Sequence, residues 1–277
     1  MIASVHAELL LICRRLSTWG LLALALTMGV LFNYFFPYVT YLDAAAGKRN
    51  PTDLARLLPA ALVTTTVTTF PFYIGTFALI LGVLLLGSEY GWGTLKTVLM
   101  QQPNRLRLLA ARLIALAAVL VVYTLAIFAA MAVSSAAVAL HEGANLSWPD
   151  AFDIVRALAA GGLILSVWGM LGVLLGVLWR GTALAIGLGI LYGLVIEGLV
   201  SGFASSIDLL RALAHAFLRT NGYSLVASLG GRAGSVGGPG AFSGPFVGTW
   251  PALGVLLAYL VIFGAAAALL LQRRDIG

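Results

Sequence analysis

Residues 68–96 read TTFPFYIGTFALILGVLLLGSEYGWGTLK, an uncharged stretch of twenty residues followed by a short polar one. About 20 apolar residues in a helix are enough to cross the roughly 30 Å hydrocarbon core of a bilayer. That core holds no water to bond the backbone, so a spanning segment must satisfy its own amide and carbonyl groups, as a helix does. The stretch therefore predicts a membrane-spanning helix over 68–87 that leads into a polar segment.

The composition of the whole chain agrees with a membrane environment. Of its 277 residues, 61% are hydrophobic and 9% are charged, and the mean hydropathy is +1.03. Soluble proteins carry about 25% charged residues, so this chain cannot cover a water-facing surface. We therefore expect an all-α integral membrane fold that forms a single transmembrane domain over 1–277. Its six predicted spans are residues 19–36, 68–87, 108–140, 155–179, 182–203 and 249–271.

Two segments outside these spans have a clear pattern. Apolar residues recur at positions 5, 9, 12 and 16, which is one stripe of a helix. The stripe predicts a helix lying in the membrane interface over 1–18, and a plain cytosolic extension of the first span is the alternative. Residues 204–248 are predicted to form an extracellular helix, capped by Ser206, followed by a glycine-rich loop.

Basic residues close to the span ends indicate how the chain faces. Lys and Arg concentrate in the short cytoplasmic connections of membrane proteins. With both termini in the cytoplasm, that side receives the basic residues of 88–107, Arg180 and the pair Arg273-Arg274. We therefore expect both termini inside. The net charge of +6 then indicates contact with inner-leaflet lipid and not with nucleic acid.

The residues that usually carry chemistry form no catalytic or metal-binding pattern. His6, His141 and His215 are widely separated, and Cys13 is the only cysteine. Metal sites combine several such ligands, usually at close spacing. We therefore expect no catalytic residue, no metal site and no internal disulfide.

The polar insert at 88–107 is the strongest functional candidate. Glu89 is predicted to end a span, and Gly91 and Gly93 allow a sharp turn after it. Thr94 can then cap a short helix whose apolar face is formed by Leu95, Val98 and Leu99. Such a helix can seat in a groove of a soluble partner. An ordinary connection between two spans is the alternative.

Three motifs in this chain resemble those of a known family. The central one runs from Glu89 to Lys96 and is followed by Gln102-Pro-Asn-Arg105 and Ala111-Arg112. The second is Glu8 with Arg14-Arg15 before the first span, and the third is the ending Arg273-Arg274-Asp275-Ile276. Together with the length and the number of spans, they resemble the permease subunits of bacterial ABC type-2 transporters. The glycine-rich tract 230–248 departs from that family's pattern.

The resemblance implies a larger assembly in the bacterial cytoplasmic membrane. Two six-span subunits pair, the second being another copy of this chain or a close paralogue, and two ATPase subunits dock beneath them. The segment Glu89–Met100 matches the coupling helix that fits a cleft on the ATPase. Its expected coupling residues are Glu89, Tyr90, Gly91, Trp92, Gly93, Thr94, Leu95, Lys96, Val98 and Leu99.

ATP chemistry is expected on the partner chain. The sequence contains no Gly-x-x-x-x-Gly-Lys-Ser/Thr segment, which in many ATPases cradles the phosphates. We therefore expect no cofactor in this chain and no enzymatic activity of its own, with ATP and Mg bound by the partner ATPase.

A few polar residues lie within the predicted spans. An unpaired carboxylate there costs about 2.5–3.5 kcal/mol, so Glu197 should face protein or water, either in a pathway or as a structural acid. Thr65, Thr68 and Thr69, followed by Phe72 and Tyr73, form a polar and then aromatic run. This run fits either a vestibule for substrate or hydrogen bonding between helices. In the resembled family the second and fifth spans face the dimer axis, which favours the vestibule.

Glycines at positions 161, 162, 169, 172 and 176 of the fourth span predict close packing against another helix.

The function expected from all of this is the permease subunit of an ATP-driven exporter. Its apolar spans favour an amphipathic, drug-like, peptide or lipid cargo. The alternative is a membrane-embedded scaffold or a secondary carrier without an ATPase partner.

Overall fold

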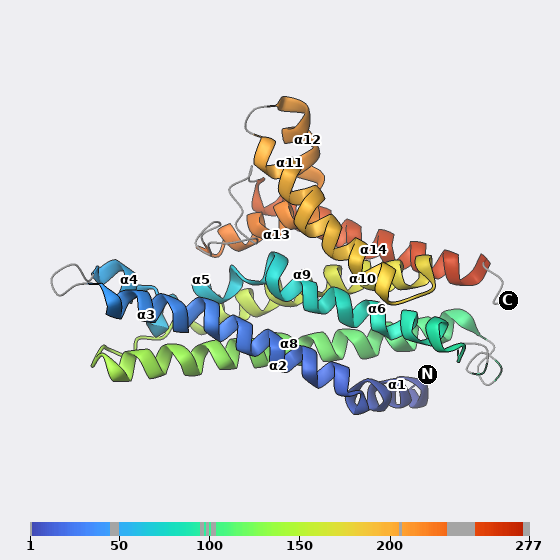
Figure 1. The fold of residues 1–277 in the computed structure, drawn as a ribbon, viewed down its shortest axis with the longest axis horizontal. Helices are drawn as coiled ribbons and strands as arrows, with labels where there is room; N and C mark the ends of the chain where they lie inside the picture. Colours follow the sequence, from blue (N-terminus) through green and yellow to red (C-terminus); the bar gives the residue numbers. More distant parts are fainter. Residues whose placement is uncertain are drawn as a thin grey trace.

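The computed structural model describes residues 2–44, 50–94, 97, 100, 104–204, 207–231 and 247–273. Within these ranges the chain is helical and has no strand (Figure 1). Six helical segments are long and apolar enough to cross a membrane, which confirms the predicted all-α, multi-pass membrane protein. They are Leu16–Asp43, Phe70–Trp92, Arg105–His141, Ala151–Trp179, Ala183–Phe203 and Thr249–Arg273.

The first span follows a separate N-terminal helix. Helix α1 (Ile2–Arg14) is separated from α2 (Leu16–Val30) by Arg15, whose backbone is extended. A π-helical turn, η1 (Leu31–Phe35), then leads into α3 (Phe36–Asp43). The span therefore continues beyond residue 36, where we expected it to end at Pro37. A π turn shifts the hydrogen-bond ladder, and Pro37 lies just after this one, where its missing N–H is accommodated.

The second span is displaced along the chain from its predicted bounds. Two short helices, α4 (Pro51–Ala55) and α5 (Leu62–Val67), precede it, with a 3₁₀ turn η2 (Pro59–Ala61) between them. The span consists of a π-helical turn, η3 (Phe70–Ile74), which contains Pro71, and α6 (Gly75–Trp92).

Of the two glycines expected to allow a turn, only Gly93 does so, because Gly91 continues α6, which ends at Trp92 with Gly93 as its C-cap. Gly93 has φ +68°, and its N–H donates to the carbonyl of Tyr90. The N–H of Thr94 donates to the carbonyl of Glu89. These two bonds form a Schellman motif, in which glycine supplies the left-handed residue.

The third and fourth spans are the longest. Helix α8 (Arg105–His141) has Asn104 as its N-cap, and the Asn104 side chain accepts a 3.0 Å bond from the N–H of Arg107. At about 1.5 Å per residue, its 37 residues exceed the membrane thickness, so α8 tilts or projects. Helix α9 (Ala151–Trp179) turns through Arg180 into the fifth span. That span comprises α10 (Ala183–Leu191), the π turn η4 (Tyr192–Ile196) and α11 (Glu197–Phe203).

A glycine-lined seam between α6 and α9 forms the centre of the fold. A Cβ atom on Gly82 would lie 2.0 Å from the carbonyl oxygen of Gly169. One on Gly172 would lie 2.1 Å from that of Leu79. The two backbones approach too closely for any side chain at these positions, which confirms the close packing expected for the fourth span.

Two helices follow the fifth span. Helix α12 (Asp208–Ala216) confirms the predicted helix, with Ile207 at its N-cap position, while Ser206, the expected cap, lies outside the described residues. Helix α13 (Leu218–Ala227) was not predicted, because its polar sequence LRTNGYSLVA suggests a connection. It is buried from Leu218 to Val226. Most of the glycine-rich tract, residues 232–246, also lies outside the described residues.

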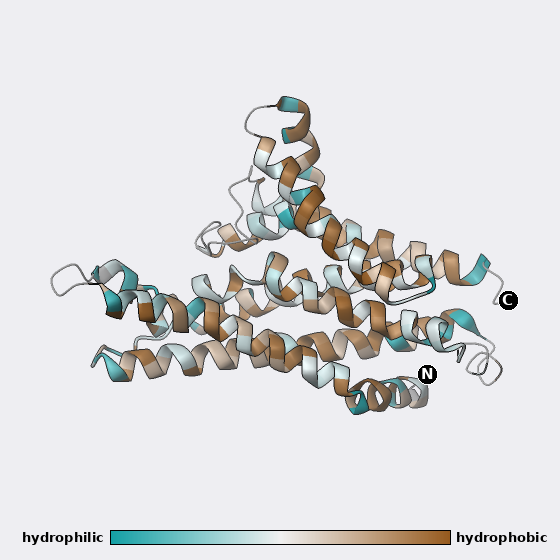
Figure 2. Ribbon diagram, viewed as in Figure 1, coloured by the Kyte–Doolittle hydropathy of each residue, from teal (hydrophilic) through white to brown (hydrophobic). Residues whose placement is uncertain are grey.

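The long helices α2, α6, α8 and α9 run side by side, α14 (Thr249–Arg273) packs along α9, and α10 and α11 run obliquely to them (Figure 1). Hydrophobic residues dominate their middle parts, and hydrophilic residues gather toward their ends (Figure 2). Helix α1, the end of α6 and the start of α8 lie at the same end as the end of α14 (Figure 1). We call this the terminal end of the molecule.

Candidate functional site

The terminal end is held together by a buried cluster of three charged side chains. The Arg112 Nη2 atom donates to Glu89 Oε1 at 2.6 Å, and Arg112 Nε donates to Glu8 Oε1 at 3.2 Å. Arg112 is 1% exposed, and both glutamates are buried. The members come from α8, α6 and α1, so the Glu8–Arg112–Glu89 cluster joins three helices that are far apart in sequence.

The charge balance of this cluster makes each member necessary. Two carboxylates face one guanidinium, and removing one partner of a buried ion pair leaves an uncompensated charge, which costs about 3–5 kcal/mol. Glu89 Oε2 and Arg112 Nη1 have no hydrogen-bond partner among the described residues. Arg112 therefore depends on both glutamates, and α1 is fixed to the bundle through it.

Other arginines tie neighbouring helices to the same end. Arg105 Nη1 donates to the carbonyl of Leu271 at 3.0 Å, joining the start of α8 to the last turn of α14. Arg15 Nη1 donates to the carbonyl of Leu84 at 3.0 Å, joining the break between α1 and α2 to α6. The bond to Leu271 satisfies a carbonyl in the last turn of α14, where carbonyls lack partners within the helix, whereas Leu84 lies inside α6.

The predicted coupling residues fall into two groups. Glu89, Tyr90, Gly91 and Trp92 form the last turn of α6, and Gly93 and Thr94 complete its C-terminal motif. Glu89 is buried against Arg112, so it anchors the segment and is not an exposed contact. Trp92 is 74% exposed. The remaining members, Leu95, Lys96, Val98 and Leu99, lie outside the described residues.

The hydroxyl groups of the threonines expected in a vestibule donate to backbone carbonyls of preceding residues. Thr68 Oγ1 donates to the carbonyl of Thr65, and Thr69 Oγ1 to that of Thr66, each at 2.7 Å. Thr65 Oγ1 donates to the carbonyl of Arg56 at 3.0 Å. These hydroxyls satisfy carbonyls around the break between α5 and η3, where the regular helix ladder is interrupted.

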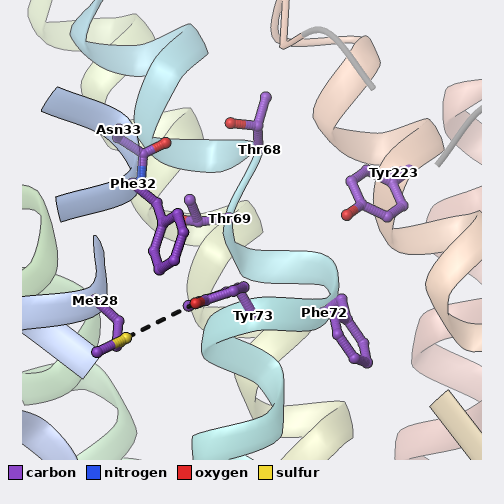
Figure 3. A pocket seen from close by; sticks show the side chains of 8 residues that line it. All are labelled: Met28, Phe32, Asn33, Thr68, Thr69, Phe72, Tyr73 and Tyr223. Atoms are coloured by element: carbon purple, nitrogen blue, oxygen red, sulfur yellow. Dashed lines mark hydrogen bonds between the residues drawn. The ribbon is translucent and has the colours of Figure 1, made fainter. Parts of the chain in front are cut away.

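Four of the five predicted vestibule residues line one small cavity. Thr68, Thr69, Phe72 and Tyr73 surround it together with Met28, Phe32, Asn33 and Tyr223 (Figure 3). Its volume of about 10 Å³ is close to the minimum that holds one water molecule. The Tyr73 hydroxyl lies 3.8 Å from the Met28 sulfur, which closes one side (Figure 3). In this conformation the cavity is not an open path for a larger molecule.

Glu197 binds the N-terminus of α13 with its buried carboxylate. Its Oε1 accepts from the N–H of Leu218 at 3.1 Å and its Oε2 from the N–H of Arg219 at 2.8 Å. Phe217, at the N-cap position, makes no side-chain cap bond. The first N–H groups of a helix have no partner within it, and the helix N-terminus favours a negative charge. Glu197, from another helix, provides both the hydrogen-bond acceptors and the negative charge. This is the structural role left open for Glu197.

The Arg219 side chain extends this second cluster toward the vestibule residues. Its Nη1 donates to the carbonyl of Gly193 at 3.0 Å, and its guanidinium lies 5.1 Å from the centre of the Phe72 ring. A cation above an aromatic face is attracted by the ring's quadrupole. Arg219 thus contacts both Glu197, through its backbone N–H, and Phe72, through its guanidinium, whereas Thr65 does not line the cavity.

Comparison with known proteins identifies a family. The family described as "Protein of unknown function (DUF2705)" matches residues 21–277, and the chain belongs to it. No curated protein matches the chain.

Proposed function

We propose that this chain is the permease subunit of an ATP-binding-cassette transporter, driven by two separate ATPase subunits that dock at its terminal end. The observation that carries the proposal is the Glu8–Arg112–Glu89 cluster. Glu89 lies just before the polar segment between α6 and α8, and Arg112 lies after it, near the start of α8.

The cluster gives that segment a rigid connection to the bundle. The polar segment begins a few residues after Glu89 and ends two helical turns before Arg112. A displacement of the segment would move α6 and α8 together, and α1 with them through Glu8. Packed interfaces switch between discrete arrangements, so ATP-driven closure of a partner could in this way select a second arrangement of the spans.

The remaining parts of the proposal follow from the resemblance in the motifs. A second copy of this chain or a paralogue completes the pathway, and ATP and Mg are bound by the ATPase subunits. The cargo is an amphipathic drug-like molecule, peptide or lipid, and transport is outward across a bacterial cytoplasmic membrane. The low charge of the spans supports such a cargo, since polar nutrients require more polar groups along their path.

Co-purification tests the partner directly. The full-length tagged protein, extracted from membranes in detergent, is expected to bring down a nucleotide-binding chain with ATPase activity. The double substitution Leu95→Asp with Leu99→Asp should abolish this capture, because it places charges on the predicted docking face. Leu146→Asp, in the connection between α8 and α9, is the matched control and should capture the partner normally.

Two outcomes would reject the proposal. One is a stable oligomer of this chain alone, which would favour a scaffold or a secondary carrier. The other is full capture and normal ATPase activity in the Leu95→Asp, Leu99→Asp protein.

The orientation has its own test. Cys13 is exposed on α1 and is the only cysteine of the chain. With both termini in the cytoplasm, a membrane-impermeant maleimide should label Cys13 in inverted vesicles and not in intact cells. Labelling of Cys13 in intact cells would show that the N-terminus lies outside, contrary to this proposal.

A further inference from the structure

A hollow at the terminal end is lined partly by the predicted coupling residues Gly91 and Trp92, but its charged group, Arg15, has no role in the coupling proposal. Its volume is about 640 Å³, within the roughly 300–1,000 Å³ typical of small-molecule sites. It is formed where the break between α1 and α2 meets the end of α6 and the turn between α9 and α10. The lining residues are Arg15, Leu16, Ser17, Leu84, Ser88, Gly91, Trp92 and Thr182.

Arg15 gives the hollow a positive charge that no carboxylate of the described residues pairs with. One nitrogen, Nη1, bonds to Leu84 and Ser88, which holds the half-buried guanidinium in place. Among the described residues, no carboxylate forms an ion pair with Arg15, and no further hydrogen bond uses its Nε or Nη2. A guanidinium fixed in this way presents its remaining N–H groups as a fork that matches the oxygens of a phosphate.

Three hydroxyl groups line the same hollow. Ser17 lies in the first turn of α2, Ser88 lies near the end of α6, and Thr182 precedes α10. Gly87 brings the last two together, because a Cβ on it would lie 3.4 Å from Thr182 Cγ2. Hydroxyls donate readily to phosphate oxygens. Ser88 Oγ already donates to the carbonyl of Leu84 at 2.6 Å. The hollow therefore combines the charged donor of Arg15 with the hydroxyls of Ser17 and Thr182.

The rim of the hollow faces apolar surroundings. Leu16 is 88% exposed and Trp92 is 74% exposed, and both lie at the ends of membrane spans. Tryptophan near a span end sits at the boundary between headgroups and acyl chains. A soluble anion would gain nothing from these two side chains, whereas a lipid would cover them with its chains.

We propose that this hollow binds the phosphate headgroup of an anionic phospholipid, with Arg15 on the phosphate and Leu16 and Trp92 against the acyl chains. Thr182 and Ser17 complete the polar side of the site. The site shares Gly91 and Trp92 with the predicted coupling residues, but its phosphate contact at Arg15 needs no ATPase and stands even if the transport proposal fails.

Native mass spectrometry of the full-length protein in detergent tests the site with phosphatidylglycerol as the probe. Arg15→Gln should weaken lipid binding about tenfold, because it removes a charge-assisted contact. The control Arg14→Gln makes the same change of charge at an exposed neighbouring residue and should leave binding unchanged. Diacylglycerol, which lacks the phosphate, should bind weakly to all three proteins.

A second pair of variants leaves the bonds of Arg15 intact. Ser17→Asp places a carboxylate in the hollow, and an acid in the first turn of α2 favours that helix, so folding should be preserved. We expect Ser17→Asp to expel phosphatidylglycerol and Ser17→Asn to retain it.

Three results would overturn the proposal. Equal losses in Arg14→Gln and Arg15→Gln would show only a general surface attraction. Full binding by Ser17→Asp would place the lipid elsewhere. Displacement of the lipid by excess inorganic phosphate would indicate a site for a soluble anion.

Discussion

Two buried carboxylates of this protein are stabilised in different ways. At the terminal end, Glu89 pairs with the side chain of Arg112, which also binds Glu8 on a third helix. Near the far end of the fifth span, Glu197 accepts two backbone N–H groups at the start of α13. The first arrangement joins distant segments through charges, and the second fixes one helix end through its backbone.

This difference determines how each site responds to change. The Arg112 guanidinium has no substitute, so its loss leaves two carboxylates facing each other without compensation. The N–H groups that bind Glu197 are part of the backbone and can donate to a neutral oxygen as well as to a charged one. We therefore expect the terminal cluster to be sensitive to charge, and the α13 contact to be sensitive to hydrogen bonding.

The largest effect is expected for Arg112→Met. It should lower the free energy of unfolding by about 3–5 kcal/mol, since it leaves Glu8 and Glu89 buried and unpaired. Thermal unfolding of the full-length protein in detergent measures the loss. Arg107→Met, at an exposed position of the same helix, is the control. Equal stability of the two variants would show that the cluster does not hold α1 and α6 to α8.

The seam between α6 and α9 separates the two sites, and Gly172→Ala tests its rigidity. The added methyl group would lie 2.1 Å from the carbonyl oxygen of Leu79, so the helices must move apart. Such overpacking costs about 1–3 kcal/mol. Gly187→Ala, where nothing lies within 4 Å, should be neutral or slightly stabilising in the same unfolding assay. An unaffected Gly172→Ala protein would contradict the close approach.

A smaller effect is expected for Glu197→Gln. The amide oxygen can still accept one of the two N–H groups, so the loss should be about 1 kcal/mol. Glu197→Leu leaves both N–H groups buried and unpaired and should cost more, about 1–3 kcal/mol. If Glu197→Gln destabilised the protein as much as Arg112→Met, charge would matter equally at both sites and the comparison would fail. Unchanged transport by Glu197→Gln would remove the pathway role.

The smallest effect on stability is expected for Thr68→Val. Among the described residues its hydroxyl bonds only to the carbonyl of Thr65, so the loss should stay within about 1 kcal/mol. The vestibule prediction adds that cargo selectivity changes in transport assays with membrane vesicles. A change in assembly with unchanged selectivity would leave Thr68 with a purely structural role.

The spans could be predicted from sequence because their signal is local. Stretches of apolar residues identified all six spans, and two errors at span ends arose where proline or glycine fits more than one backbone conformation. Pro37 was interpreted as a break, although the helix accommodates it after η1. Gly91 was interpreted as part of a turn together with Gly93, although of these two only Gly93 has a positive φ. Which glycine ends a helix depends on the bonds made around it.

The two charge clusters could not be predicted because their partners are distant in sequence. Glu8 and Arg112 are 104 residues apart, and only the packing of α1 on α8 brings them together. The position of Arg112 inside the predicted third span was the available signal, since a charge there requires a partner. Helix α13 was missed for a related reason. Its polar residues look like a loop until Glu197 and the neighbouring spans satisfy them.

The most direct test of the central claim is the alkylation rate of Cys13 in the complex with its ATPase partner. Cys13 reports the position of α1, which is fixed to the bundle through Glu8 and Arg112. We predict that a non-hydrolysable ATP analogue changes this rate in the wild-type complex and not in an Arg112→Lys complex that still binds its partner. A rate independent of nucleotide in the wild type, or an equal response in Arg112→Lys, would contradict coupling through the cluster.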